Sequence, residues 1–207
     1  MIKISYSITC CDELIEIQRL ISFLQQHKRP EDEICVLLDK PKASQELLDQ
    51  LHRYSSANWI VLKESEFKGH FADWKNELTK MCSGDIIINL DADEIPNLYL
   101  IENLPFILEN NESDILLVPR INIVQGITEQ HLKVWGWKQN EKGWVQWPDM
   151  QPRIYRNNGE ISWKNKVHEI LDGYKCYAYL PEMEEYALYH PKSIQKQEKQ
   201  NNYYNTL

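Results

Sequence analysis

The residues best suited to chemistry are two aspartates, Asp91 and Asp93, which follow the apolar run 86–90 directly. Side chains two residues apart on an extended backbone point to the same side, so both carboxylates would face one cleft. Two such carboxylates repel each other unless a cation lies between them. Mg²⁺ or Mn²⁺ suits this place, because these ions prefer oxygen ligands and leave room for phosphate oxygens. The spacing therefore predicts a divalent-cation site for a phosphorylated substrate, and the plainer alternative is a solvated acidic turn.

Two periodicities in the first half predict the elements that position this pair. Apolar runs without polar alternation indicate strands covered by helices on both faces, and spacings of three and four indicate helices. We predict strands at 2–8, 33–38, 59–62 and 85–90. We predict one helix that follows Asp12 as its N-cap, and two more at 44–54 and 71–81. This alternating order favours an α/β fold with an open, mostly parallel sheet and right-handed crossovers.

Open parallel sheets bind ligands beyond the carboxyl ends of their strands. Thr9 follows the first predicted strand, Asp39 ends the second, and Asp91 ends the fourth. We therefore expect these polar residues to meet at one edge of the sheet.

Composition narrows the class of protein. The chain has 207 residues, which favours one domain, and a formal net charge of −8 at pH 7. The acidic balance argues against sequence-independent binding of nucleic acid. The five cysteines form no CxxC pair, which is typical of a reducing compartment. With neither a signal-peptide pattern nor an apolar run long enough for a transmembrane segment, we expect a soluble cytoplasmic protein, a monomer or weak homo-oligomer.

The second half differs from the first in its high tryptophan content. Further strands are predicted at 115–123, 154–156, 178–180 and 186–189. Five of the seven tryptophans gather between residues 135 and 163, namely Trp135, Trp137, Trp144, Trp147 and Trp163. Tryptophan stacks on sugar rings, so this stretch could hold a sugar acceptor or act as a lid; it could equally cover the core. Trp135, Trp137 and Trp144 are the better loop candidates.

Because the sequence contains neither an internal repeat nor a clear linker, we expect the two halves to share one core. We divide the chain into a first half at 1–97, a second half at 98–192 of the same domain, and a polar C-terminal helix or tail at 193–207.

Two segments carry a resemblance to a known family. Residues 71–78 (FADWKNEL) and 83–94 (SGDIIINLDADE) resemble the core of family 2 glycosyltransferases, in which a helix, a Gly-Asp turn and an apolar strand lead to a DxD-type motif. The resemblance covers residues 2–97 well and 145–192 more loosely. It implies a GT-A fold in which 1–97 is the nucleotide-sugar-binding half and 98–192 the acceptor-side half. It further implies a nucleotide-diphosphate sugar as donor (a UDP-sugar is favoured), a divalent cation and a glycan-type acceptor. Inversion at the anomeric carbon is the family expectation.

The same resemblance assigns roles in the first half. It implies that Asp39 and the backbone near Thr9 bind the base or ribose, and that Lys75 approaches the phosphates. Asp91 would contact ribose or metal, and Asp93 would bind the metal.

In the second half, the family pattern of an acid a few positions before an arginine falls on Asp149 and Arg153. An inverting transferase needs a carboxylate that takes the proton of the acceptor hydroxyl. Asp149 is the first candidate for this base and Glu169 the second. Arg153 would pair either with Asp149 or with the acidic motif.

Three further residues have roles by resemblance alone. His168, beside Glu169, would bind the cation, a phosphate or the acceptor. His190 would complete the metal site, and Lys192 would bind the phosphates.

The leading hypothesis is thus a metal-dependent glycosyltransferase. A nucleotidyltransferase is an alternative, although the turn after the first strand lacks the glycines that such enzymes use. A non-catalytic carbohydrate-binding module built on the tryptophans is another, although it would need neither Asp39 nor the aspartate pair.

Overall fold

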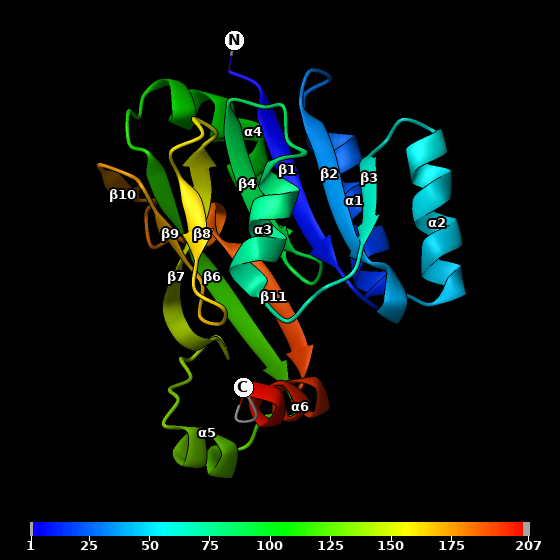
Figure 1. Cartoon of the computed structure of the whole chain (residues 1–207). Coiled ribbons are helices and arrows are strands. Elements are labelled where there is room, and N and C mark those ends of the chain that lie inside the picture. Colours follow the sequence, from blue (N-terminus) through cyan, green and yellow to red (C-terminus); the bar gives the residue numbers. More distant parts are fainter. Residues whose placement is uncertain (1, 205–207) are drawn as a thin grey trace.

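The first half of the chain forms the parallel part of the sheet, with strands in the order β3-β2-β1-β4 (Figure 1). The structure is a computed structural model and describes residues 2–204. The strands are β1 (Ile4–Cys10), β2 (Glu33–Asp39), β3 (Val61–Ser65) and β4 (Ile86–Asp91). They are joined by α1 (Leu14–His27), η1 (Lys40–Lys42), α2 (Gln45–Ser56) and α3 (Phe71–Thr79). The predicted alternation of strands and helices is confirmed.

The second half extends the same sheet with the antiparallel strand β7, which pairs with β4 on one side and β6 on the other. Next come β11, parallel to β6, and β5, antiparallel to β11. The strands are β5 (Ile95–Pro96), β6 (Ile115–Gln125), β7 (Val145–Arg156), β8 (Ser162–Lys164), β9 (Ile170–Asp172), β10 (Tyr177–Tyr179) and β11 (Leu188–Ser193). The helices are α4 (Leu98–Glu109), α5 (Glu129–Trp135), η2 (Glu184–Tyr186) and α6 (Ile194–Tyr204).

Helices cover both faces of the sheet, as the apolar strands require. On one face, α1, α2 and α4 bury aliphatic side chains such as Leu20, Leu47 and Leu104 against the sheet. On the other face, α3 packs with the β8–β9 hairpin, and Leu78 and Trp163 lie in the same cluster. Figure 1 shows α3 and β8 in front of the sheet and α1 behind it. The predicted α/β fold with a mostly parallel sheet is therefore confirmed.

Several predicted boundaries were wrong. The cap of α1 is Glu13 rather than Asp12. The Glu13 carboxylate accepts hydrogen bonds from the backbone N–H groups of Cys11 (2.8 Å) and Asp12 (3.0 Å), which shapes the turn before the helix. β3 spans Val61–Ser65, later than predicted. Trp59, which was predicted in this strand, stacks instead on Tyr54 in the last turn of α2.

The largest difference lies in β7, which begins at Val145 although only its last three residues were predicted as strand. Residues 146–152 (QWPDMQP) contain two prolines and lack a run of apolar residues, a pattern typical of a loop. Pairing with β6 nevertheless holds them extended. Asp149 therefore lies within a strand.

No helix among residues 2–204 is long and apolar enough to cross a membrane.

Candidate active site

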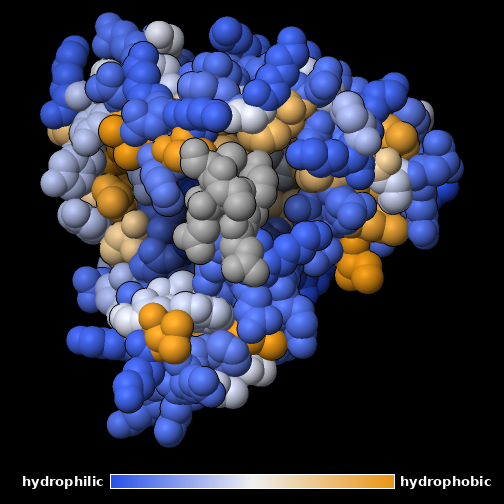
Figure 2. All heavy atoms as spheres, turned by 60° about the horizontal axis from the view of Figure 1, so that its bottom comes forward, coloured by the Kyte–Doolittle hydropathy of each residue, from blue (hydrophilic) through white to orange (hydrophobic). Residues whose placement is uncertain are grey.

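A cavity of about 480 Å³ lies where β4, β6 and β11 end, with α6 beside it. Figure 2 looks onto this end of the molecule and shows mainly hydrophilic side chains around a recess. Eight of the predicted site residues line the cavity: Lys75, Asp91, Asp149, Arg153, His168, Glu169, His190 and Lys192. Thr9, Asp39 and Asp93 do not line it directly.

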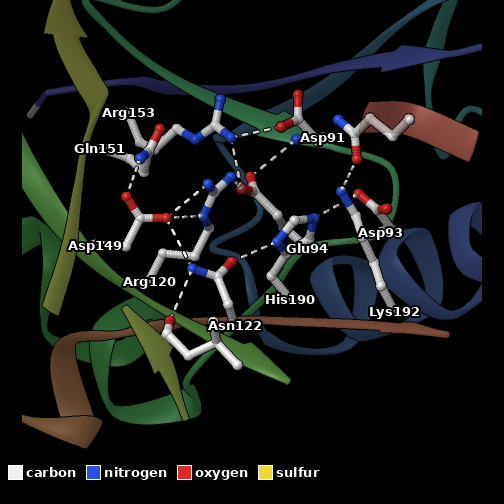
Figure 3. A network of polar contacts seen from close by, with 12 residues as sticks. Asp91, Asp93, Glu94, Arg120, Asn122, Asp149, Gln151, Arg153, His190 and Lys192 are labelled. Atoms are coloured by element: carbon white, nitrogen blue, oxygen red, sulfur yellow. Dashed lines mark hydrogen bonds and ion pairs between the residues drawn. The ribbon is translucent and has the colours of Figure 1, made fainter. Parts of the chain in front are cut away.

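Asp149 is bound by donors on two neighbouring strands. Its Oδ2 accepts hydrogen bonds from Arg120 Nε (2.9 Å), Arg120 Nη2 (2.6 Å) and Asn122 Nδ2 (2.9 Å), and its Oδ1 accepts one from Gln151 Nε2 (2.6 Å). Arg120 and Asn122 are two residues apart on β6, so both point to the side on which Asp149 lies (Figure 3). Burial would raise the pKa of Asp149, but the Arg120 guanidinium outweighs it and holds that pKa below its usual value.

A second cluster surrounds the acidic motif. Glu94 is completely buried and accepts hydrogen bonds from Arg153 Nη2 (2.5 Å), Arg120 Nη1 (3.1 Å) and the backbone N–H of Asp91 (3.0 Å). Arg153 Nη2 also contacts Asp91 Oδ2 at 2.5 Å. Burial would raise the pKa of Asp91, but Arg153 and other nearby cations hold it well below its usual value. Of the two predicted partners of Arg153, the structure therefore shows the acidic motif.

Asp93 points the other way, toward β11 and α6. Its Oδ1 lies 3.5 Å from His190 Nε2, and its Oδ2 lies 3.1 Å from Lys196 Nζ. Burial would raise the pKa of Asp93, but His190 and Lys192 keep it well below its usual value. His190 Nδ1 lies 2.7 Å from Asn122 Oδ1, so contacts run from Asp149 through Asn122 and His190 to Asp93 (Figure 3).

Glu169 and Lys75 form an ion pair that lines the cavity. Lys75 Nζ lies 2.5 Å from Glu169 Oε1 and 4.4 Å from the centre of the Trp163 ring. Asn76 fixes the β8 strand here, because its side chain donates to the carbonyl of Trp163 (2.9 Å) and accepts from the N–H of Trp163 (2.8 Å). Asn76 thereby braces the hairpin that carries Glu169.

His168 lies in the turn of this hairpin and has a backbone φ of 53°. The left-handed conformation is uncommon for a residue with a side chain, and it reverses the chain between β8 and β9. The turn places His168 at the wall of the cavity, next to Glu169.

The ends of β1 and β2 lie beside the cavity. Thr9 is the register partner of both Leu37 on β2 and Asp91 on β4. Asp39 is buried; its Oδ1 accepts a hydrogen bond from the Phe67 backbone N–H (3.0 Å) and its Oδ2 lies 3.1 Å from Lys42 Nζ. Asp39 thus fixes the segment that follows β3.

Lys192 contacts helix α6. Lys192 donates to Gln200 Oε1 on α6 (2.8 Å), and burial lowers its pKa.

Trp137 lines the cavity, whereas Trp144, a loop candidate, is buried against Trp147. Lys142 lies over the Trp144 ring at 4.4 Å, and Trp144 matches the alternative in which a tryptophan covers the core.

Sequence reasoning missed four residues of this site: Glu94, Arg120, Asn122 and Lys196. Glu94 adjoins the acidic motif and could have been included. Arg120 and Asn122 alternate with apolar residues near the end of a predicted strand, which is a usable signal only when the neighbouring strands are known. Lys196 belongs to a polar helix with no distinguishing pattern.

Comparisons with known proteins agree with this architecture. The family model described as Glycosyl transferase family 2 matches residues 5–179. The crystal structure of S. aureus TarS is similar to 91% of this chain at 16% identity and a TM-score of 0.62, and 36% of the TarS chain is covered.

Two structures of TarS 1-349 give the same fold. The complex with UDP-GlcNAc has 18% identity and a TM-score of 0.62, and 92% of this chain and 58% of that chain are covered. The complex with UDP has 16% identity and a TM-score of 0.62, and 95% of this chain and 62% of that chain are covered. The chain thus spans less than two thirds of the length of each of these chains.

None of the curated proteins compared with the chain matches it. The family model covers most of the sequence, from the first strand to the end of β10, and the fold is the one seen in TarS. The chain therefore belongs to glycosyltransferase family 2.

Proposed function

We propose that the chain transfers a sugar from a nucleoside diphosphate sugar, with a UDP-sugar as donor, to a hydroxyl group of a glycan-type acceptor. The observation that carries the proposal is the convergence on one cavity of an ionised carboxylate, Asp149, the acidic strand end at Asp91, and the cations Lys75 and Lys192. A cavity of about 480 Å³ is within the usual size of a small-molecule site. The TarS structures with UDP and UDP-GlcNAc support the choice of donor.

Asp149 is the proposed base. Its lowered pKa keeps the carboxylate ionised at neutral pH, ready to accept a proton. Arg120 and Asn122 occupy Oδ2, so Oδ1, which accepts one hydrogen bond from Gln151, is the oxygen proposed to take the proton. As that proton leaves, the acceptor oxygen bonds to the anomeric carbon and the bond to the diphosphate oxygen breaks. One such displacement inverts the anomeric configuration.

Glu169, the second candidate, has a different proposed role. Its carboxylate is paired with Lys75 at 2.5 Å, and Lys75 lies against Trp163. Glu169 is therefore proposed to position Lys75, whose ammonium would contact the donor phosphates. Lys192 is proposed to contact them from the β11 side.

A divalent cation fits the other end of the site. Among residues 2–204, no group of three or more His, Cys, Asp or Glu side chains is placed to hold a metal ion. His190 Nε2 and Asp93 Oδ1 nevertheless face each other at 3.5 Å, two atoms that a cation can join. Mg²⁺ and Mn²⁺ are often held by one or two protein ligands with phosphates and water as the others. When bound, the cation would neutralise charge on the departing diphosphate.

The remaining residues of the site also have proposed roles. Thr9 and Asp39, at the ends of β1 and β2, are proposed to bind the base or ribose of the donor. Asp91 is proposed to contact ribose or cation, because Arg153 occupies only one of its oxygens in the contacts described above. His168 and Trp137, on the wall of the cavity, are proposed to face the acceptor.

Thermal unfolding tests this function. A ligand that binds the folded state raises the melting temperature by mass action. We expect UDP and UDP-sugars to stabilise the protein more than other nucleotides, and more with Mn²⁺ than without it. The Asp93→Asn variant should lose the Mn²⁺-dependent part, and Asp49→Asn, an exposed position on α2, should keep it.

Other outcomes of this experiment would contradict the proposal. Stabilisation by free glycans but by no nucleotide would favour a carbohydrate-binding module. Stabilisation by nucleoside triphosphates over UDP-sugars would favour a nucleotidyltransferase.

A further inference from the structure

Asn122 lies at the centre of the polar network, between the proposed base and the proposed cation site. It stands on β6, where its register partners are Val145 on β7 and His190 on β11. Figure 3 shows its side chain between Asp149 and His190. One amide group therefore contacts both halves of the site.

The hydrogen bonds fix how this amide is oriented. Asn122 Nδ2 donates to Asp149 Oδ2 (2.9 Å) and to the Val145 carbonyl (3.4 Å), two groups that can only accept. The opposite orientation would set the amide oxygen against the Asp149 carboxylate. Asn122 Oδ1 must therefore face His190 Nδ1, at 2.7 Å.

This orientation determines the proton on His190. An amide oxygen only accepts, so the contact with Asn122 Oδ1 requires a hydrogen on His190 Nδ1. A neutral imidazole carries one such hydrogen, so Nε2 is left with a lone pair. That lone pair faces Asp93 Oδ1 at 3.5 Å. In the neutral ring, two acceptors face each other there, which is the arrangement that a cation joins; a doubly protonated ring would instead donate from Nε2 to Asp93.

We propose that Asn122 is a positioning residue that fixes the neutral His190 ring with its hydrogen on Nδ1, and so presents Nε2 together with Asp93 to a divalent cation. The same amide holds the Asp149 carboxylate, which couples the orientation of the base to that of the cation site. The cation part of this inference rests on the proposed function. The position of the ring hydrogen does not, because it follows from the contacts of Asn122 alone.

Long-range ¹H–¹⁵N NMR of the histidine rings in the intact chain, without metal or donor, tests the inference. Spectra recorded at a pH high enough to leave the rings neutral, with the His190 signals assigned by their loss in His190→Gln, report which nitrogen carries the hydrogen. We expect Nδ1–H in the wild type. In Asn122→Leu, Nδ1 loses its acceptor while Asp93 still accepts, so Nε2–H should become the major form.

Mn²⁺ affinity, measured by electron paramagnetic resonance, gives a second readout. Loss of a residue that orients a metal-binding histidine typically weakens binding by about 10- to 100-fold, and we expect this range for Asn122→Leu. Asn103→Leu removes a similar amide on α4 that donates only to the Tyr99 carbonyl, and it should bind Mn²⁺ as the wild type does.

Two results would overturn the inference: Nε2–H in the wild type, or an unchanged tautomer in Asn122→Leu. If Asn122→Leu does not fold, the wild-type spectrum still decides. A wild-type protein with Nδ1–H that binds neither Mn²⁺ nor UDP would contradict the proposed function while supporting the role of Asn122 in setting the tautomer.

Discussion

Arg120 and Asp149 are opposite each other in the register of β6 and β7, and Arg120 Nη2 lies 2.6 Å from Asp149 Oδ2. The same guanidinium reaches Glu94 Oε1 at 3.1 Å through Nη1. Arg120 thereby connects the proposed base to the buried acid behind the acidic motif. The pair keeps Asp149 ionised in a place where burial alone would favour the neutral form.

The pH dependence of the reaction should therefore depend on Arg120. Arg120 lowers the pKa of Asp149, and burial raises it. When Arg120→Met removes the charge and leaves the burial, Asp149 should take up a proton at higher pH. The acidic limb of the kcat/KM profile should then move to higher pH by about 1 to 3 units. The profile is measured by UDP release from a UDP-sugar.

Arg120→Lys is the matched control, because it keeps the charge and loses the paired geometry. Its acidic limb should stay nearer the wild-type position. An acidic limb that does not move in Arg120→Met would show that Asp149 does not set it.

Stability should depend most on Arg153. Arg153 is buried and pairs with Asp91 and with Glu94, which has no exposed surface. Arg153→Met leaves two carboxylates without their main partner, and breaking a buried pair in this way typically costs about 3–5 kcal/mol of unfolding free energy. Urea unfolding measures this loss as a lower midpoint at an unchanged m-value.

The double variant Arg153→Met/Glu94→Gln should lose less stability than the sum of the two single variants, because the residues share one network. Strict additivity would contradict the pairing. The free energy of unfolding should also fall at acidic pH, because the pKa of Asp91 is lowered in the folded state. Its contribution to stability is present above the pKa of the unfolded state and is lost as the pH falls below it.

Lys196 should weaken cation binding in the free protein. Its ammonium lies 3.1 Å from Asp93 Oδ2 and 3.5 Å from Glu16, so it neutralises the carboxylate that is proposed to bind the cation. Lys196→Met should lower the Kd for Mn²⁺ by about 3- to 10-fold, given the usual strength of a partly exposed ion pair. Lys199→Met makes the same change at an exposed position of α6 and should leave the Kd unchanged. Weaker Mn²⁺ binding in Lys196→Met would contradict this view of Asp93.

The two candidate bases can be separated by one further variant. Glu169 is paired with Lys75, so Glu169→Gln should disturb donor binding more than the chemical step. We expect a higher KM for the donor and a kcat within about tenfold of the wild type, whereas loss of a general base typically costs 10²- to 10⁴-fold. A loss of kcat in that larger range, with KM unchanged, would instead identify Glu169 as the base.

The first half of the fold could be predicted from sequence because its structure is local. β2 and β4 are apolar runs, and a helix follows each of β1, β2 and β3, so periodicity and the right-handed crossover suffice to place Asp91 at a strand end. The second half depends on pairing between distant residues. Asp149 joins Arg120 only because β7 runs antiparallel to β6, and no local pattern encodes that register.

The same reason explains which site residues were missed. Asn122 and His190 are 68 positions apart and meet only as register partners on β6 and β11. Asp149 was singled out by family resemblance although its segment was not predicted as a strand. Trp144 lies outside any strand, as its place beside glycine indicated, but it is buried and packs on Trp147, a contact that its sequence neighbours do not reveal.

The most direct test of the account is UDP release by Asp149→Asn, measured with water or glycerol as acceptor and alongside UDP affinity by calorimetry. Asp149→Asn keeps the size of the side chain and removes its ability to take a proton. We predict that UDP release falls by about 10²- to 10⁴-fold and that the Kd for UDP stays within about threefold of the wild type. Release at the wild-type rate, or no release from any UDP-sugar by the wild type, would contradict the account.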